Sequence, residues 1–238
     1  MLNIVTALGI EAKPIIKKFN LKNQNGIYQN NYLNLIITGQ GKIKSAINTA
    51  LLLQKYPFRT LNIGIAGSSI HQINEGFYVH KITDTDSGLE YYPDRFENSQ
   101  ELYCVSKPGT YYPLVDMESS GFFEACYKFL SVEKIILYKI VSDTPDIKPD
   151  TQEIPHLINS HIEIIEKLLE KKDDFFEEIN EYLNEASKKM PLTKTQYEDL
   201  KKIITFYKIK NLPFPTLPVL NKKEEVKEFL KFLTSSVS

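Results

Sequence analysis

Arginine is scarce in this chain of 238 residues, since only Arg59 and Arg95 stand among its 29 basic side chains. An AT-rich, lysine-preferring genome explains the bias at the level of composition. Arginine is nevertheless the side chain best suited to hold phosphate through a bidentate fork. The chain is therefore poor in the commonest clamp for phosphate.

Cysteine and histidine are also few. The two cysteines, Cys104 and Cys126, have no metal-ligand spacing, and neither have the four histidines. Two isolated cysteines are typical of reduced thiols rather than of a disulfide scaffold. We expect a cytoplasmic protein with no metal site and no cofactor.

Long apolar runs and an excess of charge are absent as well. No run approaches the roughly 18 residues of a membrane span, and residues 1–8 alternate like a strand with no basic leader before them. The net charge is −1, so bulk electrostatics favour neither nucleic acid nor a membrane surface as a partner. A hydrophobic content of 42% is ordinary for a soluble globular protein of one large or two small domains.

The first 145 residues alternate between apolar strands and helices. Strands are predicted at residues 2–7, 32–38, 60–65, 76–82 and 134–141, and helices after the first, at 42–54 and at 118–130. The helix at 42–54 carries Ile43, Ala46, Ile47 and Ala50 on one face. Strands that are apolar throughout need cover on both faces, so the pattern predicts an α/β fold with a central sheet between helices. Functional residues in such sheets gather at the carboxyl ends of strands.

The last third of the sequence is helical in pattern. Apolar residues three or four apart from Ile158 to Leu183 predict one long helix or two in succession. A further helix is predicted at the capping box Thr195-x-x-Glu198, followed by a proline-containing loop and a short helix at 222–233. We expect residues 1–170 to form a catalytic domain and residues 171–238 a helical extension.

Two short acidic motifs lie at predicted element ends. Val115-Asp116-Met117-Glu118 opens a helix, and Ser142-Asp143 ends the strand at 134–141. A carboxylate accepts two hydrogen bonds from a cis-diol, and a carboxylic acid beside a leaving group donates a proton. Either motif alone is also compatible with a solvated first helical turn or an N-cap.

As an ordered set, these motifs resemble those of methylthioadenosine/S-adenosylhomocysteine nucleosidases, in the nucleoside phosphorylase superfamily (purine and uridine phosphorylase type 1), which carry Val-Glu-Met-Glu and a strand ending in Ser-Asp. The resemblance implies a three-layer, phosphorylase-like core with a twisted mixed sheet. It also implies that Met117 packs against the nucleoside, that Glu118 binds the ribose 2′- and 3′-hydroxyls, and that Asp143 protonates the purine N7. Ser142 and Lys139 become substrate-binding candidates. Aspartate rather than asparagine at 143 implies an adenine-type base.

Three further segments agree with this resemblance. Thr6 to Glu11 is similar to the nucleosidase opening Gly-Ala-Met-Glu-Glu-Glu, with Glu11 matching the third acid, the family's general base for the attacking water. The first two acids are replaced here by Gly9 and Ile10. Thr38-Gly39-Gln40-Gly41-Lys42 resembles Ser-Gly-Ile-Gly-Lys, and Asn62 to Gly67 resembles Asn-Thr-Gly-Ser-Ala-Gly. Glycines such as Gly67 let the backbone approach a ligand closely.

The acceptor of the sugar is open between water and phosphate. Phosphorylases carry a phosphate-binding serine where this chain has Ile65, which together with the shortage of arginine favours hydrolysis. Four residues remain candidate ligands for phosphate as a co-substrate: Lys42, Ser68, Ser69 and Lys139. We therefore expect hydrolysis of a 5′-modified adenosine, with a purine nucleoside phosphorylase as the alternative. A non-catalytic nucleoside-binding protein on the same fold is the alternative from another class.

The resemblance covers residues 1 to about 170 and departs from the nucleosidases at one point inside them. Between Ser106 and Val115 the segment is shorter, so contacts to the base must be rebuilt, with residues 106–112 as candidates. Tyr111 and Tyr112 there suit stacking on the base as well as simple packing. The C-terminal residues have no counterpart in a standard nucleosidase. They are candidates for a wall of the pocket or for a contact in the expected homodimer or higher homo-oligomer.

Overall fold

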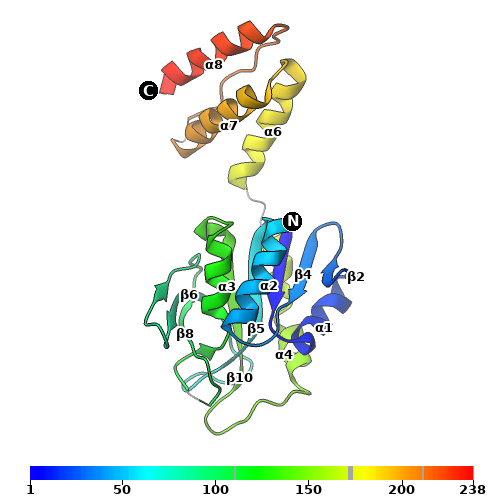
Figure 1. Cartoon of the computed structure of the whole chain (residues 1–238), viewed down its shortest axis with the longest axis vertical. Helices are drawn as coiled ribbons and strands as arrows, with labels where there is room; N and C mark the ends of the chain where they lie inside the picture. Colours follow the sequence, from blue (N-terminus) through cyan, green and yellow to red (C-terminus); the bar gives the residue numbers. More distant parts are fainter. Residues whose placement is uncertain (110, 171–173, 211, 238) are drawn as a thin grey trace. The chain divides into compact units, whose positions relative to one another are not determined.

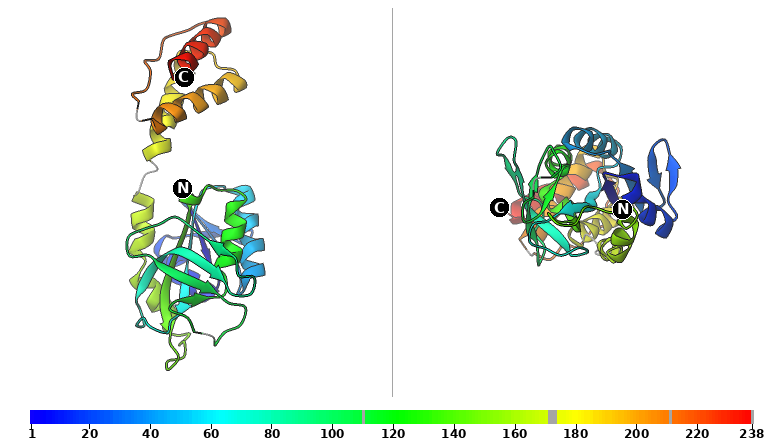
Figure 2. Two further views of the ribbon diagram at one scale, coloured as in Figure 1. Left: turned by 90° about the vertical axis from the view of Figure 1, so that its left-hand side faces the viewer. Right: turned by 90° about the horizontal axis from the view of Figure 1, so that it is seen from below.

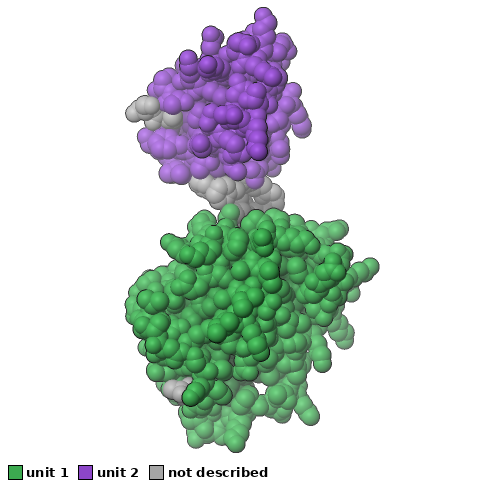
Figure 3. Space-filling view, viewed as in Figure 1, with its two compact units in different colours: residues 1–169 green, residues 170–238 purple. Residues whose placement is uncertain are grey.

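The computed structural model describes residues 1–109, 111–170, 174–210 and 212–237. These residues form two compact units, Met1–Leu169 and Glu170–Ser238, which Figure 3 colours separately. Residues 171–173, which follow the expected domain boundary at 170, lie outside the described residues. The units are considered one at a time.

A mixed sheet forms the centre of the first unit (Figure 1). Its middle strands are parallel and run in the order β10 (Ile135–Asp143), β5 (Arg59–Gly67), β1 (Leu2–Thr6) and β4 (Leu33–Ile37). The strand β6 (Gly76–Asp84) runs antiparallel to β10, and β7 (Glu90–Tyr91) pairs with β6. From β6 the sheet continues through β8 (Gln100–Cys104) and β9 (Val115–Asp116) back to β5. An edge hairpin of β2 (Lys22–Gln24) and β3 (Ile27–Gln29) extends β4.

Helices cover both faces of this sheet. Along β10, Ile136, Tyr138 and Ile140 pack into one core, and Leu137 and Val141 pack into the other. The first core includes α1 (Gly9–Lys18), α4 (Ile154–Ser160) and α5 (Glu163–Glu170), and the second includes α2 (Lys42–Lys55) and α3 (Ser119–Tyr127). In the left-hand view of Figure 2, α4 and α5 lie on one side of the sheet and α2 and α3 on the other. The expected α/β class with a covered mixed sheet is confirmed.

The helices α2 and α3 touch at their amino-terminal ends. A β-carbon on Gly121 would lie 2.0 Å from the carbonyl oxygen of Lys42, so the first turn of α3 approaches the first turn of α2 as closely as only glycine permits. The residues just before these two turns, Gly41 and Glu118, are brought together by this contact.

The most apolar side chains of α2 do not face the core. Ile43 and Ile47 are 76% and 56% exposed, and Leu51 is exposed beside them. The inward face is formed instead by Ser45, Thr49, Leu52 and Leu53. Small side chains on that face let α2 lie close to α3, and the more apolar stripe remains on the surface.

The second unit is helical, with α6 (Asp174–Lys189), α7 (Lys194–Ile209) and α8 (Lys223–Val237) around a core that includes Ile179, Leu183, Ile204 and Val226. None of the helices in the described ranges combines the length and apolar character that a membrane crossing requires.

Two predictions for the helical part of the chain were wrong. The periodic stretch is already broken between Ser160 and Glu163, where the chain turns, and its described residues form α4, α5 and α6. The helix α7 is capped two residues before the expected position: the Thr193 hydroxyl accepts a hydrogen bond from the Gln196 amide, and the Gln196 side chain accepts one from the Thr193 amide. Glutamine serves as well as glutamate in a capping box. The sequence therefore offers two overlapping capping boxes, Thr193-x-x-Gln196 and Thr195-x-x-Glu198, and the pattern alone does not tell which one is used.

Candidate active site

A pocket opens at the carboxyl ends of β1, β5 and β10, the edge of such a sheet at which ligands bind. Six of the seven predicted site residues line it: Glu11, Gly67, Met117, Glu118, Ser142 and Asp143. They come from segments far apart in the sequence that the parallel strands bring to one edge of the sheet. Lys139, the seventh, is not among the lining residues.

Glu11 lies in the first turn of α1 and is only 1% exposed. The amide of Leu8 donates a hydrogen bond to its Oε2 at 2.7 Å, and the amide of Ile65 donates one to its Oε1 at 3.0 Å. Burial raises the pKa of Glu11 above its ordinary value, against the opposite effects of these two amides and of Lys139. Each carboxylate oxygen keeps a lone pair for another donor, so the side chain is fixed in place and still able to accept a proton.

Glu118 immediately precedes α3 and is 7% exposed. Its Oε1 accepts a hydrogen bond of 2.7 Å from the amide of Gly41, which adopts a φ of 101°. Burial, reinforced by the negative charge of Asp116, raises the pKa of Glu118 to about 7. Beside it the Met117 sulfur accepts a hydrogen bond from the Gln40 side chain at 3.3 Å, so the Gly39 to Gly41 turn supports both residues of the motif.

Lys139 forms a buried ion pair behind the pocket. Its Nζ lies 2.9 Å from Oδ2 of Asp116, and the two side chains are 2% and 1% exposed. The amide and hydroxyl of Ser119 also donate hydrogen bonds to Asp116. Burial alone would lower the pKa of Lys139, but Asp116 and Glu118 raise it, so the amine stays charged. The geometry thus gives Lys139 a carboxylate partner of its own rather than a place on the pocket wall.

Asp143 ends β10 with both carboxylate oxygens engaged. The Ser142 hydroxyl donates to Oδ1 at 2.6 Å, and the Tyr111 hydroxyl donates to Oδ2 at 3.2 Å. Gly67 leaves room for this arrangement, because a β-carbon there would lie 3.1 Å from Oδ2 of Asp143. The segment that is shorter than in the nucleosidases therefore reaches the predicted catalytic acid through Tyr111.

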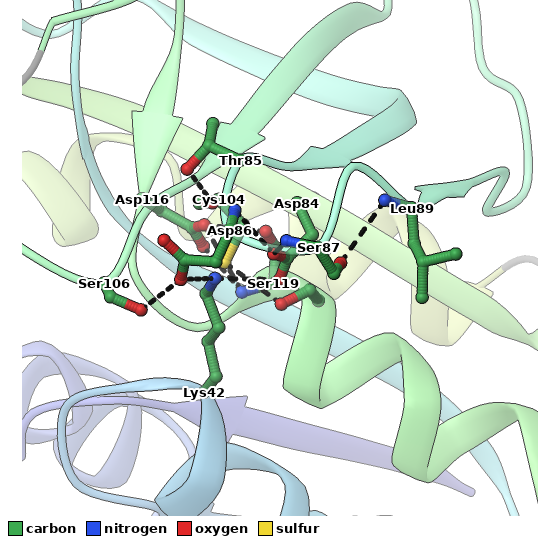
Figure 4. A network of polar contacts seen from close by, with 11 residues as sticks. Lys42, Asp84, Thr85, Asp86, Ser87, Leu89, Cys104, Ser106, Asp116 and Ser119 are labelled. Carbon is green, nitrogen blue, oxygen red and sulfur yellow. Dashed lines mark hydrogen bonds and ion pairs between the residues drawn. The ribbon is translucent and has the colours of Figure 1, made fainter.

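Three of the four candidate phosphate ligands are engaged elsewhere. Figure 4 shows Lys42 pointing to Asp84 and Asp86, with its Nζ 2.8 Å from Asp84 Oδ2 and 2.5 Å from Asp86 Oδ2. The Ser68 hydroxyl donates to the carbonyl of Pro113 at 2.6 Å, and Lys139 is paired as described above. Among the described residues that line the pocket there are four carboxylates, from Glu11, Asp116, Glu118 and Asp143, and no lysine, arginine or histidine.

Sequence reasoning missed the partners of two site residues. Lys139 is a single cation in an otherwise apolar strand, a signal that predicts a buried counter-charge, but the signal does not say which acid supplies it. Tyr111 was a candidate for a contact to the base or for packing, but its hydrogen bond to Asp143, which joins a loop to a strand end 32 positions away, was not expected. In the described part of the chain, no group of three His, Cys, Asp or Glu side chains is arranged to hold a metal ion.

No family profile and no characterised protein matches the sequence, but solved structures match the fold. The 5′-methylthioadenosine nucleosidase of Arabidopsis thaliana in its apo form superposes with a TM-score of 0.63 at 14% identity, covering 72% of this chain and 96% of that one. This chain has the fold of the methylthioadenosine nucleosidases.

Two bacterial structures are similar. A Helicobacter pylori nucleosidase mutant with 5′-methylthioadenosine in its active site matches with a TM-score of 0.61 at 13% identity, over 71% of this chain and 98% of that one. The methylthioadenosine/S-adenosylhomocysteine nucleosidase of Campylobacter jejuni matches with a TM-score of 0.60 at 16% identity, over 71% and 98%. The phosphorylase-like core implied by the sequence motifs is confirmed at the level of the fold.

Proposed function

We propose that this chain hydrolyses the N-glycosidic bond of a 5′-modified adenosine, of the methylthioadenosine or S-adenosylhomocysteine type, to adenine and the free ribose derivative. The observation that carries the proposal is the convergence of Glu11, Glu118 and Asp143 on one pocket. The three acids lie on separate elements of a fold shared with structures of methylthioadenosine nucleosidases. Cleavage of such a bond needs a base for water, a group that favours a cationic sugar and an acid for the departing purine.

Glu118 is the proposed ribose residue. Its Oε1 already accepts a hydrogen bond from the Gly41 amide, and the remaining lone pairs of the carboxylate suit the two hydroxyls of a cis-diol. When the glycosidic bond lengthens, the sugar gains oxocarbenium character. A buried carboxylate beside it stabilises that developing charge more than it stabilises the neutral nucleoside.

Glu11 and Asp143 are the proposed base and acid. Glu11 is fixed by two backbone amides, and its raised pKa brings it closer to neutrality, where a general base works best. Water loses a proton to Glu11 as its oxygen attacks the anomeric carbon. Asp143 is the proposed donor of the proton that N7 gains as the bond breaks, so that adenine leaves as a neutral molecule.

Water is favoured over phosphate as the acceptor by the charge of the pocket. A phosphate dianion entering it would face the carboxylates of Glu11, Glu118 and Asp143, with no basic side chain among the described lining residues. The Ile65 amide, a potential anion donor, is occupied by Glu11. Of the candidate ligands, Lys42 is paired with Asp84 and Asp86.

Incubation of the purified chain with methylthioadenosine, with and without phosphate, tests the proposal. We expect adenine to be released at the same rate in both cases. Glu11→Gln and Asp143→Asn should each lower kcat by about 10²- to 10⁴-fold. Strict dependence on phosphate would make the chain a phosphorylase, and an absence of turnover with tight nucleoside binding would make it a binding protein.

We also propose that the chain works as a homodimer that uses the exposed stripe of α2, formed by Ile43, Ile47 and Leu51. Three large apolar side chains one turn apart are typical of a protein interface. Ile47→Lys should shift the sedimentation coefficient to that of a monomer, whereas Leu89→Lys, at another exposed leucine, should not. An unchanged dimer in Ile47→Lys would remove α2 from the interface.

The proposed setting is the cytoplasm, with no cofactor. Cys104 and Cys126 are both buried free thiols, as expected in a reducing compartment. Dialysed and chelator-treated protein should keep full turnover, and restoration by an added metal or cofactor would overturn this part of the proposal.

A further inference from the structure

Tyr111 lies against the part of the pocket that holds Asp143. Its hydroxyl donates to Asp143 Oδ2 at 3.2 Å, and its ring edge passes 3.3 Å from where a β-carbon on Gly67 would be. Any larger residue at Gly67 would push against both Tyr111 and Asp143. The missing side chain of Gly67 therefore makes room for this tyrosine beside the acid.

The backbone that follows Tyr111 is well anchored. The carbonyl of Tyr112 accepts a hydrogen bond from the Ser69 amide at 2.9 Å, and the carbonyl of Pro113 accepts one from the Ser68 hydroxyl at 2.6 Å. The ring of Tyr112 stacks on Tyr103, with centroids 4.4 Å apart and planes at 9°. The position of Tyr111 is thus set by the end of β5 and by β8.

The direction of the hydrogen bond decides what Tyr111 can offer a ligand. Burial and the negative charge of Asp143 raise the pKa of Tyr111, so the phenol stays protonated at neutral pH and its one proton is directed to the carboxylate. The phenolic oxygen then has only acceptor capacity left. A ligand group that donates a hydrogen bond is therefore stabilised beside this oxygen, whereas a carbonyl oxygen is destabilised because both atoms are acceptors.

We propose that Tyr111 is a specificity-determining residue that selects a 6-amino purine over a 6-oxo purine. The inference rests on the proposed function, in which N7 of the base faces Asp143. The 6-substituent of a purine lies on the same edge as N7, so a base bound to Asp143 presents it toward the Tyr111 hydroxyl. An amino group donates to the free lone pair of that hydroxyl, whereas a 6-oxo group brings two acceptors together.

The test compares Tyr111→Phe with Tyr112→Phe, the same change at the adjacent tyrosine, which does not line the pocket. For each chain kcat/KM is measured with methylthioadenosine and with its 6-oxo analogue, methylthioinosine. Loss of one neutral hydrogen bond corresponds to about 2- to 10-fold. We expect the preference for the 6-amino substrate to fall by about 5-fold in Tyr111→Phe and to stay unchanged in Tyr112→Phe.

Binding of adenine and hypoxanthine, followed by calorimetry, gives a readout that does not depend on turnover. We expect Tyr111→Phe to narrow the difference between the two affinities. An equal ratio of the adenine and hypoxanthine affinities in wild type and Tyr111→Phe would overturn the inference. Tighter binding of both bases by Tyr111→Phe would also overturn it, because Tyr111 would then compete with the base for the carboxylate of Asp143. A wild-type chain that prefers adenine yet never cleaves the nucleoside would refute the proposed function and leave the base selection standing.

Discussion

Gly64 faces the carboxylate of Glu11 so closely that a β-carbon on Gly64 would lie 2.8 Å from Oε1. That oxygen is held in place by the Ile65 amide, and the other by the Leu8 amide. The proposed general base cannot move aside without giving up a hydrogen bond from a backbone amide. The position of Glu11 on α1 therefore requires a glycine at residue 64 in the middle of β5.

Gly64→Ala should lower kcat by about 100-fold, because a displacement of about 1 Å in a catalytic group has an effect of that size. Gly9→Ala is the matched control, since nothing lies within 4 Å of the added carbon and Gly9 is the first residue of α1. The measurement is steady-state hydrolysis of methylthioadenosine, with circular dichroism to check the fold. Full activity in Gly64→Ala would show that Glu11 does not need its present position.

Lys139→Met should destabilise the chain by about 3–5 kcal/mol, because it leaves Asp116 as an unpaired buried charge. Lys18→Met is the control: Lys18 and Glu166 lie 2.9 Å apart as well, but their side chains are 48% and 40% exposed, so the loss should stay below about 1 kcal/mol. Denaturant unfolding measures both. The double variant Asp116→Asn, Lys139→Met should recover most of the loss, and equal losses in the two lysine variants would contradict the buried ion pair.

Nucleoside binding should weaken below pH 7. Burial and Asp116 raise the pKa of Glu118 to about 7, and only the ionised carboxylate accepts from both ribose hydroxyls. Ionisation is complete above this pKa and is lost as the pH falls, so Kd should be flat above pH 8 and rise by about tenfold per unit below pH 6. Calorimetry with methylthioadenosine in a Glu11→Gln background, where turnover should be about 10²- to 10⁴-fold slower, measures the affinity. Adding Glu118→Gln should remove this dependence, and a dependence that survives would assign it to another group.

A chain ending at Glu170 should fold and keep hydrolysing methylthioadenosine. All residues proposed for the site lie between Glu11 and Asp143, and the first unit has its own two cores. A cooperative thermal transition checks the fold, and kcat/KM within about threefold of the full chain, an order-of-magnitude allowance, is the expected result. Loss of turnover in a folded truncated chain would give residues 171–238 a place in the site, as the sequence analysis allowed.

The arrangement of the site was largely accessible from the sequence. Strands that are apolar throughout must be covered on both faces, and parallel strands end at a common edge, so motifs at Glu11, Gly67 and Asp143 were expected to meet. The two-residue strand β9 was not foreseen, and Val115 and Asp116 were placed just before a helix predicted to begin at Glu118. Two residues carry no periodicity, and only their pairing with β5 and β8 makes them a strand.

Other features depend on tertiary contacts that local patterns do not contain. Ile43 and Ile47 repeat at helical spacing as the residues of a core face would, yet they lie on the surface. The spacing of apolar residues alone does not distinguish a face buried in the core from an exposed face that suits an interface. The pairing of Lys139 with Asp116 and of Tyr111 with Asp143 joins residues more than 20 positions apart. Such contacts follow from the register of the sheet and the path of a loop.

The acidic lining of the pocket has a consequence for the molecules that must stay out. Adenosine nucleotides share the base and ribose of the proposed substrate and differ by carrying phosphate, and this lining offers carboxylates and, among its described residues, no cation. Repulsion between like charges is strong in a partly buried site. The protein should therefore neither bind nor hydrolyse AMP and ATP, even at concentrations far above those of its substrate. The cell's adenine nucleotides would then be protected by the charge of the pocket alone.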